Sequence, residues 1–189
     1  YFRGLLLTLK GTSSEAMSVS VKWDGAPAVV CGTNPDNGQF FVGTKAVFAK
    51  AAKINYTKKD IAKNHGTDEL GQKLLKCLVH LKKLNIQGVV QGDLLFIDDS
   101  ITRKNIDGKP HLTFTPNTIT YAVPEGGDLA KQIDRAKLGI IFHTTYTGDS
   151  LANMNAQGGA DVSSFAKSND VFFDNASYKD VSGSAKFTA

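Results

Sequence analysis

The sequence predicts an α+β fold with largely antiparallel sheets. Three observations lead to this fold class: β-like segments joined by turn-forming residues, one long amphipathic helical segment, and a shorter helical segment before the last clear strand. A chain of 189 residues is long enough to bury a core as one domain. We therefore expect a single domain over residues 1–189.

The first predicted structure is a β-hairpin. Alternating valines favour an extended segment over residues 18–31, which Gly25 and Pro27 interrupt. The run from Asn34 to Gly38 is rich in turn-forming residues, and residues 39–48 have the aromatic and β-branched content of a return strand. These two strands are expected to pair.

Residues 68–84 are the clearest predicted helix. Leucines recur there at helical spacing from Leu70 to Leu81, and lysines occupy other positions, so one face is expected to be core and the other basic. Thr67 or Asp68 is expected to cap its N-terminus.

The remaining elements follow from alternation and turn residues. The predicted segments are strands at residues 88–97, 119–123 and 138–147, a turn at 107–110 and a helix at 128–137. Residues 152–189 are rich in small and polar residues, so we expect an irregular connection there, with only 171–173 resembling a strand.

Charge is distributed unevenly along the chain. The formal net charge is +4, but residues 45–83 hold ten lysines against three acidic residues. A positive segment of this kind attracts DNA, RNA or nucleotide phosphates. The alternative, given equal weight, is a solvated lysine-rich surface that only maintains solubility.

Cysteine and histidine spacing excludes several classes of site. Cys31 and Cys77 have no C-x-x-C partner, so neither a disulfide scaffold nor a structural zinc site is indicated, and a cytoplasmic setting is expected. No apolar run is long enough for a membrane span. The four histidines are expected to be structural or surface residues; they are His65, His80, His111 and His143. Neither a serine nucleophile elbow nor a P-loop occurs.

Four short segments in a fixed order carry the functional interpretation. They are Lys22-Trp23-Asp24-Gly25, Gly43-Thr44-Lys45, Gln91-Gly92-Asp93-Leu94-Leu95-Phe96 and Phe142-His143-Thr144-Thr145-Tyr146-Thr147-Gly148-Asp149-Ser150-Leu151. The first has the form K-x-D-G, and the order and approximate spacing resemble the nucleotide-binding motifs of one superfamily. That superfamily consists of the adenylation (nucleotidyltransferase) domains of ATP-dependent DNA and RNA ligases and mRNA capping enzymes. The resemblance covers residues 18–151, which we take as the core of the domain.

The resemblance implies two antiparallel sheets with flanking helices, an ATP-grasp-like fold that binds ATP between the sheets. It makes Lys22 the nucleophile that attacks the α-phosphorus of ATP and forms a covalent lysyl-AMP intermediate. A lysine amine of ordinary pKa is almost fully protonated at neutral pH, so nearby cations or burial must favour its neutral form. Lys45 and a bound Mg²⁺ are the available cations.

The other candidate site residues also follow from the resemblance. Asp93 is the expected metal-binding or ribose-contacting carboxylate, and Phe142 is expected to stack on adenine. Gly25 would allow close approach of the nucleotide to the backbone. The remaining expected nucleotide contacts are Ser20, Val21, Asp24 and Lys45. Partners implied are a nucleotide and, through the segment from Lys45 to Lys83, DNA or RNA.

Departures from the superfamily pattern leave alternatives open. Lys45 replaces an arginine, Asp93 and Ser20 replace glutamates, and His143 replaces an aspartate. The E-G-hydrophobic and K-x-K elements are missing and are expected near or after Ala189, so we expect a chain truncated at both ends. A capping-type guanylyltransferase shares the same chemistry and is distinguished by its use of GTP.

A second resemblance points to an uncharacterised family of tailed-bacteriophage proteins. The shared segments are Lys-Trp-Asp-Gly-Ala-Pro-Ala, Gln-Gly-Asp-Leu-Leu and Thr-Pro-Asn-Thr-Ile-Thr-Tyr-Ala. Together with the departures, it motivates a function of another class: a catalytically degenerate phage protein that binds nucleic acid or assists assembly. The expected location then includes the cytoplasm of an infected host cell.

Overall fold

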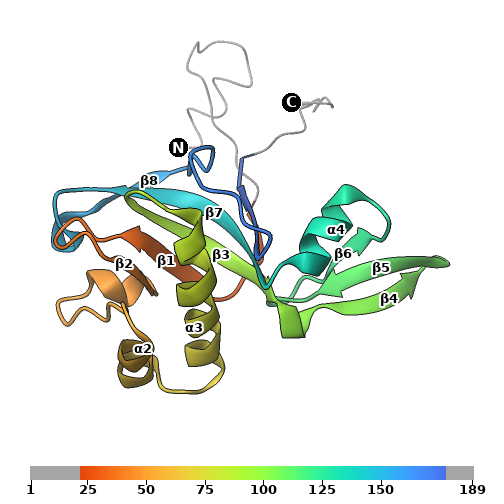
Figure 1. The fold of residues 1–189 in the computed structure, drawn as a ribbon, viewed down its shortest axis with the longest axis horizontal. Helices are drawn as coiled ribbons and strands as arrows, with labels where there is room; N and C mark the ends of the chain where they lie inside the picture. The colour runs from red at the N-terminus through yellow and green to blue at the C-terminus, as the bar shows by residue number, and fades with distance from the viewer. Residues whose placement is uncertain (1–21, 178–189) are drawn as a thin grey trace, which may run out of the picture.

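The larger of two sheets is built around two long neighbouring strands, β3 and β7 (Figure 1). The computed structural model describes residues 22–177 of the chain. Within them, this sheet has the order β2-β1-β3-β7-β8, and β9 also pairs with β7. The bounds are β1 Ala28–Thr33, β2 Phe40–Gly43, β3 Val89–Ile97, β7 Leu138–Thr147, β8 Asn155–Gly158 and β9 Val171–Asn175. Among the strand pairs of residues 22–177 in this sheet, β7 with β9 is the parallel one, and an isolated bridge between Thr144 and Gly159 is also parallel.

The second sheet is a three-stranded meander beside the first one (Figure 1). It consists of β4 Thr102–Ile106, β5 Lys109–Phe114 and β6 Tyr121–Pro124, all antiparallel. Asp107 and Gly108, with φ of 51° and 76°, make the tight turn between β4 and β5, as left-handed turn residues do. Helix α4, Asp128–Arg135, buries Ala130 and Ile133 in a cluster shared with this sheet. The predicted α+β class with two largely antiparallel sheets is thus confirmed.

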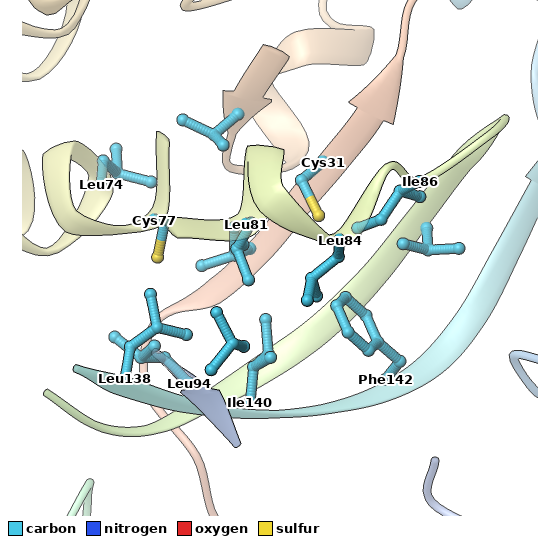
Figure 2. Close-up of a cluster of buried hydrophobic side chains, with 14 of the residues drawn as sticks. Cys31, Leu74, Cys77, Leu81, Leu84, Ile86, Leu94, Leu138, Ile140 and Phe142 are labelled. Atoms are coloured by element: carbon cyan, nitrogen blue, oxygen red, sulfur yellow. The ribbon is translucent and has the colours of Figure 1, made fainter. Parts of the chain in front are cut away.

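Helix α3, Glu69–Leu81, forms the main core against one face of the larger sheet (Figure 2). Asp68 caps its N-terminus by accepting a hydrogen bond from the Gly71 amide at 3.2 Å. Leu74 and Leu81 are fully buried in one cluster with residues of β1, β3 and β7. The helical prediction for residues 68–84 is confirmed, although its last turn is the 3₁₀ helix η2, Lys82–Leu84.

Two short helices were not expected from the sequence. The expected return strand over residues 39–48 ends at Gly43, because Thr44 caps a 3₁₀ helix, η1, at Lys45–Phe48. Helix α2, Lys58–His65, was not predicted, because Ile61 is its single buried residue and it lacks apolar periodicity. Two further 3₁₀ turns are η3, Asp98–Ser100, and η4, Leu151–Asn153.

The segment after residue 151 adds two strands to the larger sheet. The strand expected at 171–173 is present as part of β9, whereas β8 and the packing of this segment against the core were not expected. Strands β8 and β9 both pair with β7. Phe165 and Val171 are 8% and 5% exposed and join the cluster under α3. The composition hid this because small polar residues surround a few apolar anchors.

Candidate functional site

The face of the larger sheet turned away from α3 carries a short polar strip between two apolar clusters. Val90 and Leu94 of β3 point into the α3 core, so alternation places Gln91 and Asp93 on the opposite face. Leu95 belongs to the cluster shared with the second sheet, and Val89 to a cluster with η1 and η4. Asp93 thus lies between these clusters, at a place where a polar ligand can reach the sheet.

The segment Lys22 to Gly25 runs directly beside this strip. The Ala26 amide donates to the Leu94 carbonyl at 2.9 Å, which continues the pairing of β1 with β3. A Cβ placed on Gly25 would lie 2.5 Å from the Asp93 Cβ and 2.8 Å from the Leu94 carbonyl oxygen. Only glycine allows this close approach. The K-x-D-G segment and Asp93 are therefore adjacent in space, although they lie far apart in the sequence.

Asp24 joins this segment to the loop between β5 and β6. Its carboxylate accepts four hydrogen bonds of 2.7–2.8 Å: from the Asn117 side chain, the Thr118 amide and hydroxyl, and the Ile119 amide. Its own amide donates to the Tyr121 hydroxyl at 2.8 Å, and the Tyr121 ring stacks on Trp23. We refer to these contacts as the Asp24 clamp.

The Asp24 clamp gives Asp24 a structural role that the sequence did not predict. Three of its hydrogen bonds reach Oδ2 and one, from the Asn117 side chain, reaches Oδ1, so most of the acceptor capacity of the carboxylate is used within the protein. The side chain links the Lys22 to Gly25 segment with the loop between β5 and β6, and its predicted contact with the nucleotide stays a prediction. The hydrogen bonds, first that from the Ile119 amide, hold the pKa of Asp24 well below its ordinary value.

Asp24→Asn is expected to lower the melting temperature at pH 7, and the difference from the native chain should shrink as the pH falls to 3. An aspartate with a lowered folded-state pKa stabilises the fold above its unfolded pKa, about 3.9, and this contribution fades on acidification. Thermal denaturation between pH 3 and 7 measures the gap. Asp107→Asn, at the exposed tip of the β4–β5 turn, is the control. A gap that stays constant with pH would contradict the clamp.

His143 faces Asp93 where β3 pairs with β7. The pairing of β3 with β7 changes register between Gln91 and Gly92, whose partners are Thr144 and Phe142, so His143 sits in a bulge. Its Nε2 lies 3.4 Å from an Asp93 carboxylate oxygen, and the side chains are 28% and 20% exposed. His143 was expected to be a structural or surface residue, and it is a partly exposed residue that lies at ion-pair distance from Asp93. The sequence signal for this orientation was the position of His143 directly after Phe142. Adjacent residues of a strand point to opposite faces of the sheet, so His143 points away from the core that contains Phe142.

Phe142 is a core residue in this structure. It is 0% exposed, contacts Phe165 edge-on with ring centroids 5.4 Å apart, and points towards the residues of α3 and η2 (Figure 2). The prediction that its ring stacks on adenine is not met, because both faces of the ring are covered by protein. Strand alternation is the physical reason: Phe142 shares a face with Leu138 and Ile140, opposite to the Asp93 face.

The two lysines expected at the nucleotide are both exposed. Lys22 is three residues from Gly25, a span of roughly 11 Å at most, and within the described residues no hydrogen bond or ion pair joins it to Asp93. Lys45 begins η1, at the end of a strand that is separated from β3 by β1. Among residues 22–177, the structure shows no hydrogen bond or ion pair that joins Lys45 to Asp93. Ser20 and Val21 lie outside the described residues.

The lysine-rich stretch divides into two parts. On α3, Lys73 pairs with Glu69, Lys76 with Asp98 and Asp99, and Lys83, after its end, with Asp170. These ion pairs neutralise much of the charge of that helix. The other part is an exposed set on η1, α2 and the connection between them, which we call the six-lysine surface; its members are Lys45, Lys50, Lys53, Lys58, Lys59 and Lys63.

Other candidate features lie away from the Asp93 strip. A pocket of about 470 Å³ lies between the β1–β2 turn and η2, and one of about 510 Å³ lies between α4 and β9. Within the described part of the chain, no group of three or more His, Cys, Asp or Glu side chains is arranged to hold a metal ion. None of the helices there has the length and apolar character needed to cross a bilayer.

Comparisons with known proteins identify a family but no activity. No curated protein matches the chain, and no solved structure matches it either. One family model, described as a family of unknown function (DUF6267), matches residues 2–189. The chain therefore belongs to the DUF6267 family.

Proposed function

We propose that this protein is a covalent nucleotidyltransferase of the type found in ATP-dependent polynucleotide ligases, with an ATP-grasp-like arrangement of its two sheets. The observation that carries the proposal is the contact of Gly25 with Asp93. Two segments that resemble separate motifs of one superfamily lie against each other on one sheet face. An accidental match of short motifs would not require this proximity.

The proposed reaction modifies Lys22. Its amine attacks the α-phosphorus of ATP, a nitrogen–phosphorus bond forms, the bond to the bridging oxygen breaks, and pyrophosphate leaves while the lysine proton passes to solvent. A 5′-phosphate oxygen of DNA or RNA then attacks the same phosphorus, the nitrogen–phosphorus bond breaks, and Lys22 takes up a proton and is released as the free amine. Phe142 has no part in this proposal, because its ring is buried.

Asp93 fits the Mg²⁺ that such a reaction uses. It offers a partly exposed, hard carboxylate oxygen beside the Lys22 to Gly25 segment, and Mg²⁺ in proteins is often held by one or two carboxylates together with water and phosphate. When bound, the ion would neutralise phosphate charge. Gly25 keeps the backbone close to Asp93, and the Asp24 clamp fixes the direction from which Lys22 enters.

The six-lysine surface supports a nucleic-acid partner. Six exposed lysines and one acid, Asp60, lie between residues 45 and 63, and such a surface attracts a polyanion in a salt-dependent way. It equally supports the second candidate, a degenerate phage protein that binds nucleic acid without catalysis. The hydrogen-bonded carboxylate of Asp24 and the buried Phe142 favour that candidate.

Both candidates place the protein in the cytoplasm, including that of an infected host cell, where the free thiols Cys31 and Cys77 would stay reduced.

Incubation of the protein with ATP and Mg²⁺ is expected to add one AMP to its intact mass. Lys22→Ala should lose the adduct completely, whereas Lys104→Ala, an exposed lysine of β4, should keep it. GTP in place of ATP separates the capping-type alternative. If the protein never acquires a nucleotide but binds an oligonucleotide with salt-dependent affinity, the second candidate is correct and the proposal is wrong.

A further inference from the structure

The pair formed by His143 and Asp93 has the geometry of two ligands of one metal ion. The Nε2 atom of His143 and the nearer carboxylate oxygen of Asp93 are 3.4 Å apart. Neighbouring ligands of an octahedral ion with bonds of about 2.1 Å are separated by about 3.0 Å. A small rotation of either side chain closes this difference, and both side chains are partly exposed on the same sheet face.

The other nitrogen of His143 is already oriented by the protein. Nδ1 lies 2.8 Å from the Thr144 hydroxyl. The hydroxyl can accept a hydrogen bond from Nδ1 as well as donate one to it, so a cation at Nε2 would select the tautomer in which Nδ1 carries the proton. In that tautomer Nε2 presents its lone pair to the cation that it shares with the carboxylate. A hydrogen bond from the distal nitrogen is also the usual way in which a metal-binding histidine is held in position.

We propose that His143 Nε2 and the Asp93 carboxylate together bind one divalent transition-metal ion, with Mn²⁺ as the representative ion. The inference rests on the proposed function, which places a cation at Asp93, and it adds a nitrogen ligand that selects the ion. Mg²⁺ prefers oxygen ligands, whereas imidazole favours transition metals, whose affinities rise from Mn²⁺ towards Cu²⁺. Replacement of the superfamily's aspartate by His143 would thus shift the preference from Mg²⁺ towards Mn²⁺.

Both ligand side chains are partly exposed, so solvent can supply the rest of a coordination shell. Within residues 22–177, the contact with His143 is the one ion pair of the Asp93 carboxylate. Gln91, two residues before Asp93 on the same face, is engaged by the Tyr146 hydroxyl at 2.7 Å. The remaining positions would therefore be filled by water or by phosphate oxygens. Two protein ligands and several exchangeable ones suit an ion that must also bind a nucleotide.

The test is a titration of the whole chain with Mn²⁺ in the absence of nucleotide, followed by electron paramagnetic resonance. Binding should reduce the signal of free Mn²⁺, and pulsed spectra should show coupling to a ligand nitrogen. His143→Gln is expected to remove the nitrogen coupling and weaken Mn²⁺ binding by about 10- to 100-fold or more, with a much smaller effect on Mg²⁺ measured by competition. Asp93→Asn should abolish binding of both ions.

His111→Gln provides the matched control, because His111 lies on β5 of the other sheet and contacts the Lys109 carbonyl. Thermal denaturation establishes that each variant is folded, and Thr144→Val, which keeps both ligands but removes the hydrogen bond to Nδ1, should give an intermediate affinity. Unchanged Mn²⁺ binding in His143→Gln, or spectra without nitrogen coupling, would mean that the pair is only an ion pair and would overturn the inference.

The outcome separates the inference from the proposed function. The metal titration needs neither ATP nor Lys22, so nitrogen-coupled Mn²⁺ in a protein that never forms an adduct would retain the metal site and reject the ligase-like activity. An AMP adduct together with metal binding that does not depend on His143 would do the reverse.

Discussion

Phe142→Ala is expected to lower the free energy of unfolding by about 3–5 kcal/mol, the usual cost of removing a fully buried aromatic ring. The ring lies in the cluster under α3 and contacts Phe165 edge-on. Its removal would leave a cavity between β7 and the helix, because packed backbone on both sides cannot collapse fully. Urea unfolding followed by circular dichroism measures the change.

The same variant decides between a core role and a base-stacking role for Phe142. Phe142→Leu keeps most of the apolar volume and should cost clearly less than Phe142→Ala, so a measurable protein remains even if the alanine variant unfolds. Val79→Ala, at a side chain that is 52% exposed, is the control and should change stability little. Near-native stability of Phe142→Ala together with weakened nucleotide binding would refute the core assignment.

Gly25→Ala is expected to destabilise the protein by about 1–3 kcal/mol, the usual cost of overpacking. The new methyl group would lie 2.5 Å from the Asp93 Cβ and 2.8 Å from the Leu94 carbonyl oxygen. Neither atom is the end of a flexible side chain, so the strand or the Lys22 to Gly25 segment must shift. We therefore also expect the variant to lose formation of the lysyl-AMP adduct, because Lys22 and Asp93 move apart.

Gly158→Ala is the control for this variant, since a Cβ on that residue of β8 meets no atom within 4 Å. Equilibrium unfolding gives the stability of both variants, and intact mass gives the adduct. If Gly25→Ala unfolds at the same denaturant concentration as the native chain, the close packing of the segment against β3 is incorrect.

Local patterns predicted the elements that bury a regular apolar face. The leucine spacing in α3 and the cap at Asp68 follow from helical geometry, and both are present. Runs of apolar residues likewise located β3 and β7, because a strand between two apolar layers is buried on both faces. In these segments the local sequence and the tertiary environment favour the same structure.

The site was predicted less completely, because its key contacts are made across long sequence separations. Asp24 and Ile119 are 95 positions apart, and a single sequence gives no sign that a loop would occupy the Asp24 carboxylate. The bulge that turns His143 towards Asp93 depends on how β3 and β7 align, which the composition of either strand does not determine. Helix α2 and β8 were missed because few of their residues are buried.

Strand β7 can become fully paired only late in translation. One of its edges pairs with β3, which is synthesised earlier, but the other edge is shared end to end by β9, at Leu138 to Phe142, and β8, at Thr145 to Thr147. That edge stays open until the chain through Asn175 has left the ribosome. An unpaired strand edge is a template for association with other chains. A nascent chain halted before β9 would therefore expose an edge of β7 that can pair with other chains, and β9 covers this edge in the folded protein.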